Sequence, residues 1–261
     1  MCCLFGFADY VGALSVKQKN RLILELSIAA EARGTDATGI SYNTSRGLQI
    51  YKRPLAAHRL HLRIPAETHV VMGHTRMATQ GSAKKNFNNH PFIGRVKEKP
   101  FALAHNGTIW NDLELRRTKH LPRTKVQTDS FIAVQLIEQQ KSLDFSSLRY
   151  TAEAVEGSFS FTVLSERDDL YLIKGDNPLN IVHFPKVGVY AYTSTTEILN
   201  KALARCGNWL GRGEKVDIAM GDIVKIDSRG HITHVTFDAS KFYRSSWGYW
   251  DTSLYPRAPH S

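Results

Sequence analysis

Long apolar runs are missing from this sequence of 261 residues. A membrane-spanning helix needs roughly 18 consecutive apolar residues, and the longest uncharged stretches here are well below that length. The apolar start of the chain contains Asp9 and has no basic residue before Lys17, so it does not match a secretory signal. We therefore predict a cytoplasmic protein with no membrane partner.

Cysteine is also scarce. Of the three cysteines, Cys2 and Cys3 are adjacent, which leaves no framework for disulfide bonds and suits a reducing compartment. His58 and His61 have a spacing found in metal sites, but no cysteine or acidic partner accompanies them. A glycine-rich nucleotide loop is missing too. We predict neither a metal nor a cofactor.

Acidic residues are outnumbered, because 24 Asp and Glu stand against 34 Lys and Arg and give a net charge of +10. Such a charge suits an anionic substrate, an acidic protein partner or nucleic acid. The densest basic stretch is residues 115–125. A charge run of this kind is usually a solvated loop, and we keep nucleic-acid binding as the lesser alternative.

Hydrophobic periodicity predicts helices separated by runs of strands. The helices are expected at Lys17–Arg33, from Thr128 or Asp129 through Ile137, at Ser146–Val155 and at Thr195–Cys206. The strands are expected at Gly39–Asn43, Leu48–Lys52, His69–His74, Phe101–His105, Ser158–Leu164, Leu170–Lys174, Asn180–Phe184, Val187–Thr193, Asp222–Asp227 and His231–Phe237. This order favours an α+β fold of stacked sheets with helices on their outer faces. We assign residues 1–238 to this domain and the aromatic residues 239–261 to a C-terminal tail that is a candidate docking segment.

Cys2 is the first candidate for chemistry. Removal of Met1 would leave a thiol and a free α-amine on the same residue. An α-amine has an ordinary pKa of about 7.7–8.0, so it can accept the thiol proton near neutral pH and later give it to a leaving group. The alternative interpretation of Cys2 is a small buried hydrophobic side chain.

Arg76 and Asp129 are candidates for binding an amino acid at both of its charged ends. Arg76 ends an apolar run beside glycine-rich backbone, and a guanidinium there can bind a carboxylate through two hydrogen bonds. Asp129 precedes a predicted helix, where its carboxylate can bind an ammonium. The ordinary alternatives are a solvated surface arginine and a helix N-cap formed by Asp129 or Ser130.

Asn106 and Gly107 follow the predicted strand Phe101–His105. An Asn side-chain amide and a Gly backbone N–H that point to one position form the paired donors of an oxyanion hole. Asn-Gly is also a strong turn signal, and a plain turn is the alternative interpretation.

Taken together, these motifs resemble those of the class II glutamine amidotransferases, which include the glutaminase domains of glucosamine-phosphate synthase and amidophosphoribosyltransferase. The segments that match in order are Met1–Gly6, Arg33–Gly39, Gly73–Gly81, Asn89–Pro91, His105–Gly107 and Thr128–Ser130. The resemblance implies the fold of the N-terminal-nucleophile hydrolases, a four-layer αββα sandwich.

The resemblance also implies a role for each matching residue. Cys2 is the expected nucleophile, and Asn106 with Gly107 is the expected oxyanion hole. Arg76 and Asp129 are expected to bind the carboxylate and the amino group of glutamine. The remaining expected site residues are Thr79, which lines the substrate pocket, and Arg33, Asp36, His74, His90 and His105, which shape the active site.

Three positions depart from the family pattern. Cys3 stands where the family usually has glycine, Met77 where tryptophan is common, and Gln80 where histidine often occurs. These changes alter the surroundings of the thiol, the wall of the substrate pocket and the loop from Ser82 to Asn89.

The function implied by the resemblance is hydrolysis of the glutamine side-chain amide through a glutamyl thioester on Cys2. The ammonia would be supplied to an acceptor on a separate synthase. One alternative is an N-terminal-cysteine hydrolase of another amide, which would not need both Arg76 and Asp129. The other is a catalytically silent relative that acts as a regulatory or nucleic-acid-binding module.

Overall fold

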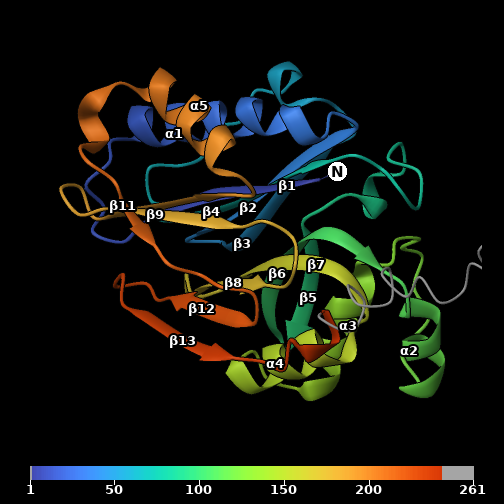
Figure 1. Ribbon diagram of the computed structural model, residues 1–261. Coiled ribbons are helices and arrows are strands. Elements are labelled where there is room, and N and C mark those ends of the chain that lie inside the picture. Colours follow the sequence, from blue (N-terminus) through green and yellow to red (C-terminus); the bar gives the residue numbers. More distant parts are fainter. Residues whose placement is uncertain (1, 243–261) are drawn as a thin grey trace, which may run out of the picture.

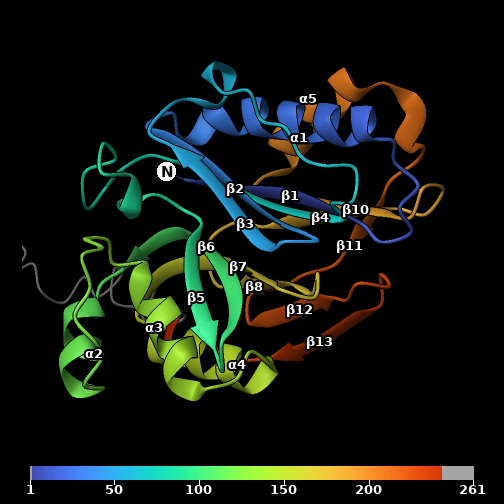
Figure 2. The same ribbon diagram turned by 180° about the vertical axis from the view of Figure 1, so that it is seen from behind.

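The computed structural model describes residues 2–242, which are arranged in four layers (Figures 1 and 2). Two helices cover a seven-stranded sheet, that sheet faces a six-stranded sheet, and further helices cover the far side of the second sheet. Neighbouring strands within each sheet run antiparallel. The αββα sandwich predicted from the sequence is confirmed.

The seven-stranded sheet has the amino-terminal strand at its centre. Its strands, in spatial order, are β11 (Glu214–Val216), β9 (Asn180–Phe184), β10 (Val189–Thr193), β1 (Cys3–Asp9), β4 (Val70–Arg76), β2 (Ala37–Thr44) and β3 (Gly47–Arg53).

All seven residues of β1 are buried. Phe5 and Phe7 pack beneath the helices, whereas Leu4 and Ala8 belong to the core between the two sheets. A strand that is covered on both faces has a continuous apolar sequence instead of an alternating one. The period-two pattern therefore does not reveal β1.

Helices α1 (Val16–Ala30) and α5 (Thr196–Cys206) cover the outer face of this sheet (Figure 1). A capping box starts α1: the Ser15 hydroxyl accepts a hydrogen bond from the Gln18 backbone, and the Gln18 side chain accepts one from the Ser15 backbone. The expected helix is three residues too long, because its end forms the separate 3-10 turn η1 (Glu31–Arg33). This turn leads the chain back toward the end of β4.

The six-stranded sheet forms the other inner layer. Its strands, in spatial order, are β13 (Ile232–Thr236), β12 (Asp222–Ile226), β8 (Leu170–Lys174), β7 (Gly157–Ser165), β6 (Lys99–Ile109) and β5 (Phe92–Val96). Helices α3 (Phe131–Gln140) and α4 (Phe145–Ala154) cover its outer face, and α2 (Asp112–Thr118) lies to one side (Figure 2). Short 3-10 turns complete the described chain: η2 (Ala57–Arg59), η3 (Asn86–Asn88) and η4 (Asn208–Leu210).

β6 does not end where the sequence predicts. The strand runs through Asn106 and Gly107, which pair with Ser160 and Phe159 of β7, and it continues to Ile109. Both the predicted strand end and the alternative of a plain turn are therefore wrong. Glycine is needed here for another reason: Gly107 has φ +140, and a Cβ atom at this position would lie 1.8 Å from the Ser158 carbonyl oxygen.

The basic stretch 115–125 is only partly a loop. Its first residues belong to α2, and Leu115 and Leu121 are buried in the same core as α3. Two short strands, β5 and β11, were also absent from the predicted elements. β11 has only three residues, and in β5 the apolar Ile93 is exposed whereas Gly94 is buried, so neither sequence shows the expected alternation.

The packed part of the chain extends past the predicted domain boundary at Asp238. Phe242 is buried against Phe159, and the Lys241 ammonium donates hydrogen bonds to carbonyl oxygens at the end of α4. The remainder of the predicted tail, residues 243–261, lies outside the described residues. Within residues 2–242, no helix is both long enough and apolar enough to cross a membrane.

Candidate active site

The strand ends that carry the predicted motifs meet at one polar cavity. The register of β1 and β4 sets Cys3 opposite Thr75, so Cys2 lies beside Arg76. The cavity is lined by Cys2, Arg76, Met77, Thr79, Gln80, His90, His105, Gly107, Thr128, Asp129 and Ser130. Most of the predicted site residues are therefore brought together; those that do not line the cavity are Arg33, Asp36, His74 and Asn106.

The lining side chains nearly fill the cavity, and we call this arrangement the closed form. The cavity volume of about 10 Å³ is room for roughly one water molecule. An amino acid needs far more space, so part of the wall has to move before one can bind. Residues 77–80 are the exposed part of that wall.

Cys2 lies half-buried immediately before β1. Its Sγ is 3.6 Å from the Met77 carbonyl oxygen, and its own carbonyl oxygen accepts a hydrogen bond of 2.8 Å from Arg33 Nε. Burial raises the pKa of the Cys2 thiol above its ordinary value. The thiol is thus protonated near neutral pH and requires a base before it can react.

Arg76 is a buried residue, which rules out the solvated surface arginine considered above. Its Nη1 donates to Asn89 Oδ1 at 2.7 Å, and its Nη2 donates to the carbonyl oxygens of Gln80 and Gly81 at 2.5 and 2.9 Å. Burial lowers the pKa of Arg76, and the nearby groups Cys2, Asp36 and Asp129 partly oppose that shift. The guanidinium is therefore held in a fixed orientation at the cavity wall.

Asp129 does not cap the helix that follows it. Its Oδ2 accepts a hydrogen bond of 2.6 Å from the Ile109 backbone N–H, and α3 begins after Ser130 without a side-chain cap. Among residues 2–242, the other carboxylate oxygen, Oδ1, accepts a single long bond of 3.4 Å, from the Ser130 hydroxyl. One oxygen of a buried carboxylate is thereby left with a weak partner beside the cavity.

Gln80 closes the cavity over Asp129. Its side-chain Oε1 accepts a hydrogen bond of 2.9 Å from the Asp129 backbone N–H. This contact connects the exposed segment after β4 to the start of α3, and it involves a residue that departs from the family pattern. Thr79, one position earlier, is exposed and lines the same cavity.

Asn106 lies immediately behind the cavity and is buried. Its side-chain amide donates a long bond of 3.4 Å to Ser194 Oγ, and its backbone carbonyl accepts one of 3.0 Å from Asn177 Nδ2. Ser194 Oγ also accepts from the Leu4 backbone N–H at 2.9 Å. Since the bond from Asn106 is long, its amide can change partners at low energetic cost.

Asp36 fixes the backbone that follows Arg76. Its carboxylate accepts a hydrogen bond of 2.7 Å from the Ala78 N–H, and its own N–H donates to the Arg76 carbonyl oxygen at 2.9 Å. Asp36 and Arg33 thus hold the main chain on either side of the thiol, although neither touches the cavity.

Three buried histidines separate the cavity from the inter-sheet core. His74 Nε2 donates to the His105 carbonyl oxygen at 2.9 Å, His105 Nδ1 is bonded to the Ser130 hydroxyl at 2.8 Å, and the rings of His74 and His90 lie 4.2 Å apart. Burial lowers the pKa of all three, to about 3 for His74. Neutral imidazoles therefore form this wall, and both nitrogens of His90 have no hydrogen-bond partner among the described residues.

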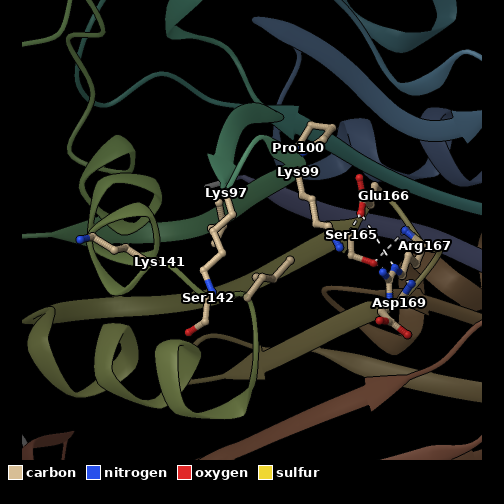
Figure 3. A pocket seen from close by; sticks show the side chains of 11 residues that line it. Lys97, Lys99, Pro100, Lys141, Ser142, Ser165, Glu166, Arg167 and Asp169 are labelled. Carbon is tan, nitrogen blue, oxygen red and sulfur yellow. Dashed lines mark hydrogen bonds and ion pairs between the residues drawn. The ribbon is translucent and has the colours of Figure 1, made fainter.

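Other depressions lie away from these residues. A pocket of about 260 Å³ at the turn between β5 and β6 is lined by Lys97, Lys99, Lys141, Glu166, Arg167 and neighbours (Figure 3). A groove of about 920 Å³ runs between α1 and the end of α5. Neither is lined by a residue that the sequence motifs single out. Within residues 2–242, no group of three or more His, Cys, Asp or Glu side chains is arranged to hold a metal ion.

Comparison with known sequences agrees with the family resemblance of the motifs. The family profile described as "Glutamine amidotransferases class-II" matches residues 16–168. The chain is 30% identical over 184 residues to glutamine--fructose-6-phosphate aminotransferase [isomerizing] of Halalkalibacterium halodurans, an alignment that covers 67% of this chain and 29% of the relative. For the enzyme of the same name from Sulfurisphaera tokodaii the identity is 30% over 187 residues, with 66% and 31% covered. The chain thus spans about a third of the length of these curated relatives.

Solved structures show the same fold at low sequence identity. The structure of an allosteric regulatory enzyme of purine biosynthesis superposes with a TM-score of 0.72 at 17% identity, covering 91% of this chain and 49% of that one. A predicted glutamine amidotransferase from Pseudomonas aeruginosa PA01 superposes with a TM-score of 0.51 at 16% identity, covering 88% and 94%.

Proposed function

The chain belongs to the class II glutamine amidotransferases, and on this premise we propose that it hydrolyses the side-chain amide of glutamine at Cys2 and supplies the ammonia to an acceptor on a separate synthase. The observation that carries the proposal is the set of groups around one cavity: the thiol of Cys2, the cation of Arg76 and the anion of Asp129. Opposite charges beside a nucleophile suit an α-amino-acid substrate.

The first chemical step is activation of the thiol. Burial raises the pKa of Cys2, so the thiol does not ionise by itself at neutral pH. After removal of Met1, the α-amine of Cys2 has an ordinary pKa of about 7.7–8.0 and takes the proton from Sγ. The thiolate attacks the carbonyl carbon of the glutamine amide, and the carbonyl oxygen becomes an oxyanion.

Asn106 and Gly107 are the proposed donors to this oxyanion. The Asn106 amide exchanges its long bond to Ser194 for the charged oxygen, which is the stronger acceptor. The tetrahedral intermediate then collapses: the C–N bond breaks, and the α-ammonium returns its proton to the departing nitrogen, so ammonia is released. A water molecule hydrolyses the glutamyl thioester, which yields glutamate and restores the thiol.

Recognition of the substrate is assigned to the two charged residues. Arg76 binds the α-carboxylate and Asp129, through its weakly engaged Oδ1, binds the α-ammonium. Thr79 lies along the same wall. Both contacts require that Gln80 withdraws from Asp129, because the closed cavity has room for only about one water molecule.

Residues 2–242 form one sandwich, so the acceptor site of the proposed synthase is not placed among these residues. Of the predicted docking segment 239–261, Lys241 and Phe242 pack on the domain, and we keep residues 243–261 as the candidate. A chain that ends at Phe242 is expected to keep its glutaminase activity but to lose association with its synthase; continued association would exclude this role.

The test is glutamate release from glutamine by the processed protein, together with its intact mass before and after treatment with a glutamine-analogue electrophile. We expect turnover and a single adduct on Cys2 in the wild type, and neither in Cys2→Ala. A correctly processed wild-type protein that shows neither would instead favour a silent binding module. Hydrolysis of a different amide supplied as substrate, without glutamate release from glutamine, would favour an N-terminal-cysteine hydrolase of that amide.

A further inference from the structure

Lys52, at the end of β3, is a cation whose charge the proposed chemistry does not use. Its ammonium donates hydrogen bonds of 2.5 Å to the Asn89 carbonyl oxygen and 2.9 Å to the Pro91 carbonyl oxygen, and it lies 5.1 Å from the centre of the Phe92 ring. Among the described residues, no carboxylate forms an ion pair with Lys52. A cation that is largely withdrawn from water without a counter-ion is costly, which suggests a specific use.

The segment that Lys52 holds is the one that orients Arg76. The Asn89 side chain accepts the hydrogen bond of 2.7 Å from Arg76 Nη1, and its amide nitrogen donates to the Ala83 carbonyl oxygen at 2.8 Å. The next residue, His90, lines the cavity. Two successive contacts therefore connect the Lys52 ammonium with the Arg76 guanidinium. The ammonium donates to the Asn89 main-chain carbonyl oxygen, and the Asn89 side chain accepts from Arg76.

The surrounding backbone is shaped for this arrangement. Asn86 Nδ2 donates to the Lys52 carbonyl oxygen at 2.9 Å, so the strand and the segment are joined in both directions. On the neighbouring strand β2, a Cβ atom at Gly39 would lie 2.2 Å from the His90 carbonyl oxygen and 2.7 Å from Lys52 Cβ. Glycine at position 39 is what lets the three segments approach one another.

We propose that Lys52 is a positioning residue for glutamine binding: it fixes the Asn89–Pro91 segment, and through Asn89 it holds Arg76 in the orientation that receives the α-carboxylate. This inference rests on the proposed glutaminase function. Lys52 does not touch the substrate, so its loss should weaken binding of glutamine and leave the reaction at Cys2 intact.

The electrostatic surroundings of Lys52 offer a second readout. The titratable groups that face it are Arg76 and His74 on β4 and His90 in the held segment, none of which is an anion. Burial, with the Arg76 charge in addition, lowers the pKa of Lys52 to about 8. Above that pH the ammonium loses its charge, and its bonds to the two carbonyl oxygens weaken.

The experiment compares steady-state glutaminase kinetics of Lys52→Met with those of Arg53→Met. Arg53 is the next residue of β3 and is exposed; its guanidinium donates to the Lys52 carbonyl oxygen at 2.9 Å. The control therefore removes one positive charge from the same strand and leaves the bonds of the Lys52 ammonium to Asn89 and Pro91 in place. We expect KM for glutamine to rise about tenfold or more in Lys52→Met with kcat within about twofold, because the two charge-assisted hydrogen bonds that fix the segment supporting Arg76 are lost. Arg53→Met should retain the wild-type KM.

Two further variants address misfolding of Lys52→Met and the pH dependence of KM. If Lys52→Met fails to fold, Lys52→Gln, which keeps a donor but no charge, carries the same expectation for KM. Lys52→Arg keeps the charge at alkaline pH, so the rise of the wild-type KM above about pH 8 should disappear in this variant.

The outcomes separate this inference from the proposed function. Suppose that the wild type is active and that folded Lys52→Met has an unchanged KM for glutamine, or that Lys52→Met and Arg53→Met show equal increases in KM. Either result would overturn the role of Lys52 and leave the glutaminase function standing. A loss of kcat without a change in KM would also overturn it. Wild type without any glutamate release would overturn the proposed function itself.

Discussion

Gln80 should control how readily a substrate reaches Cys2. The closed cavity holds roughly one water molecule, and the side chain of Gln80 maintains that closure through its bond to the Asp129 backbone N–H. Replacement by alanine removes this bond but leaves the Gln80 carbonyl oxygen, which accepts from Arg76, in place. Gln80→Ala should therefore open the cavity without disturbing the guanidinium.

The size of the effect follows from the strength of one neutral hydrogen bond. Such a bond contributes about 0.5–1.5 kcal/mol net, which corresponds to a factor of about 2–13 in the equilibrium between the closed and the open cavity. When the closed form predominates, the rate of a reaction that needs the open form scales with the open fraction. We expect the second-order rate constant for labelling of Cys2 to rise by that factor.

The assay is the time course of adduct formation by intact mass, with a glutamine-analogue electrophile at concentrations below saturation. Gln139→Ala is a matched control, because Gln139 is an exposed glutamine on α3 whose side chain makes one bond of 2.8 Å to a backbone carbonyl oxygen, that of Lys119. It should label at the wild-type rate. Labelling of Gln80→Ala that is unchanged or slower than wild type would show that the Gln80 contact does not restrict access.

Two other predictions concern the charged groups of the site. Arg76→Lys replaces a planar group with three hydrogen-bond partners by a point charge, so KM for glutamine should rise by roughly 100-fold, as measured by glutamate release; a KM within twofold of wild type would contradict carboxylate binding by Arg76. The value of kcat should increase with pH up to a plateau above about pH 8, because the α-amine accepts a proton only when it is itself unprotonated. Burial raises the pKa of the Cys2 thiol, so the thiol does not ionise before the amine does. A kcat that is already maximal near pH 6 would refute the amine as base.

The fold was largely predictable because its longer helices have one exposed face and most of its strands are short apolar runs between turn residues. The partly alternating run Asn180–Phe184 and the largely buried run Leu170–Lys174 were both predicted with the bounds that the structure has. β1 escapes the same reasoning, since it is buried on both faces, and β6 continues through an Asn-Gly pair that local statistics assign to a turn. In both cases a neighbouring layer overrides the local signal.

Of the site, the sequence predicts which residues gather but not how they are supported. Arg76 and Asp129 come together at the cavity as expected. No local sequence pattern, however, indicates that the Asp129 carboxylate accepts a hydrogen bond from the Ile109 backbone N–H instead of capping α3. The contacts of Lys52 and Ser194 were not foreseen either. Their partners lie 37 or more residues away in sequence, at Asn89 and at Leu4, and such contacts depend on the packing of the sheets.

The central position of β1 also bears on the order of events during biosynthesis. Phe5 pairs with Thr193 on β10, so β1 cannot complete its pairing until one of the last strands of its sheet has been synthesised. At about 5–20 residues per second, the amino terminus stays outside a finished sheet for roughly 10–40 s. That interval leaves the first peptide bond accessible to the aminopeptidase that would expose the α-amine of Cys2, before folding encloses the new terminus in the cavity.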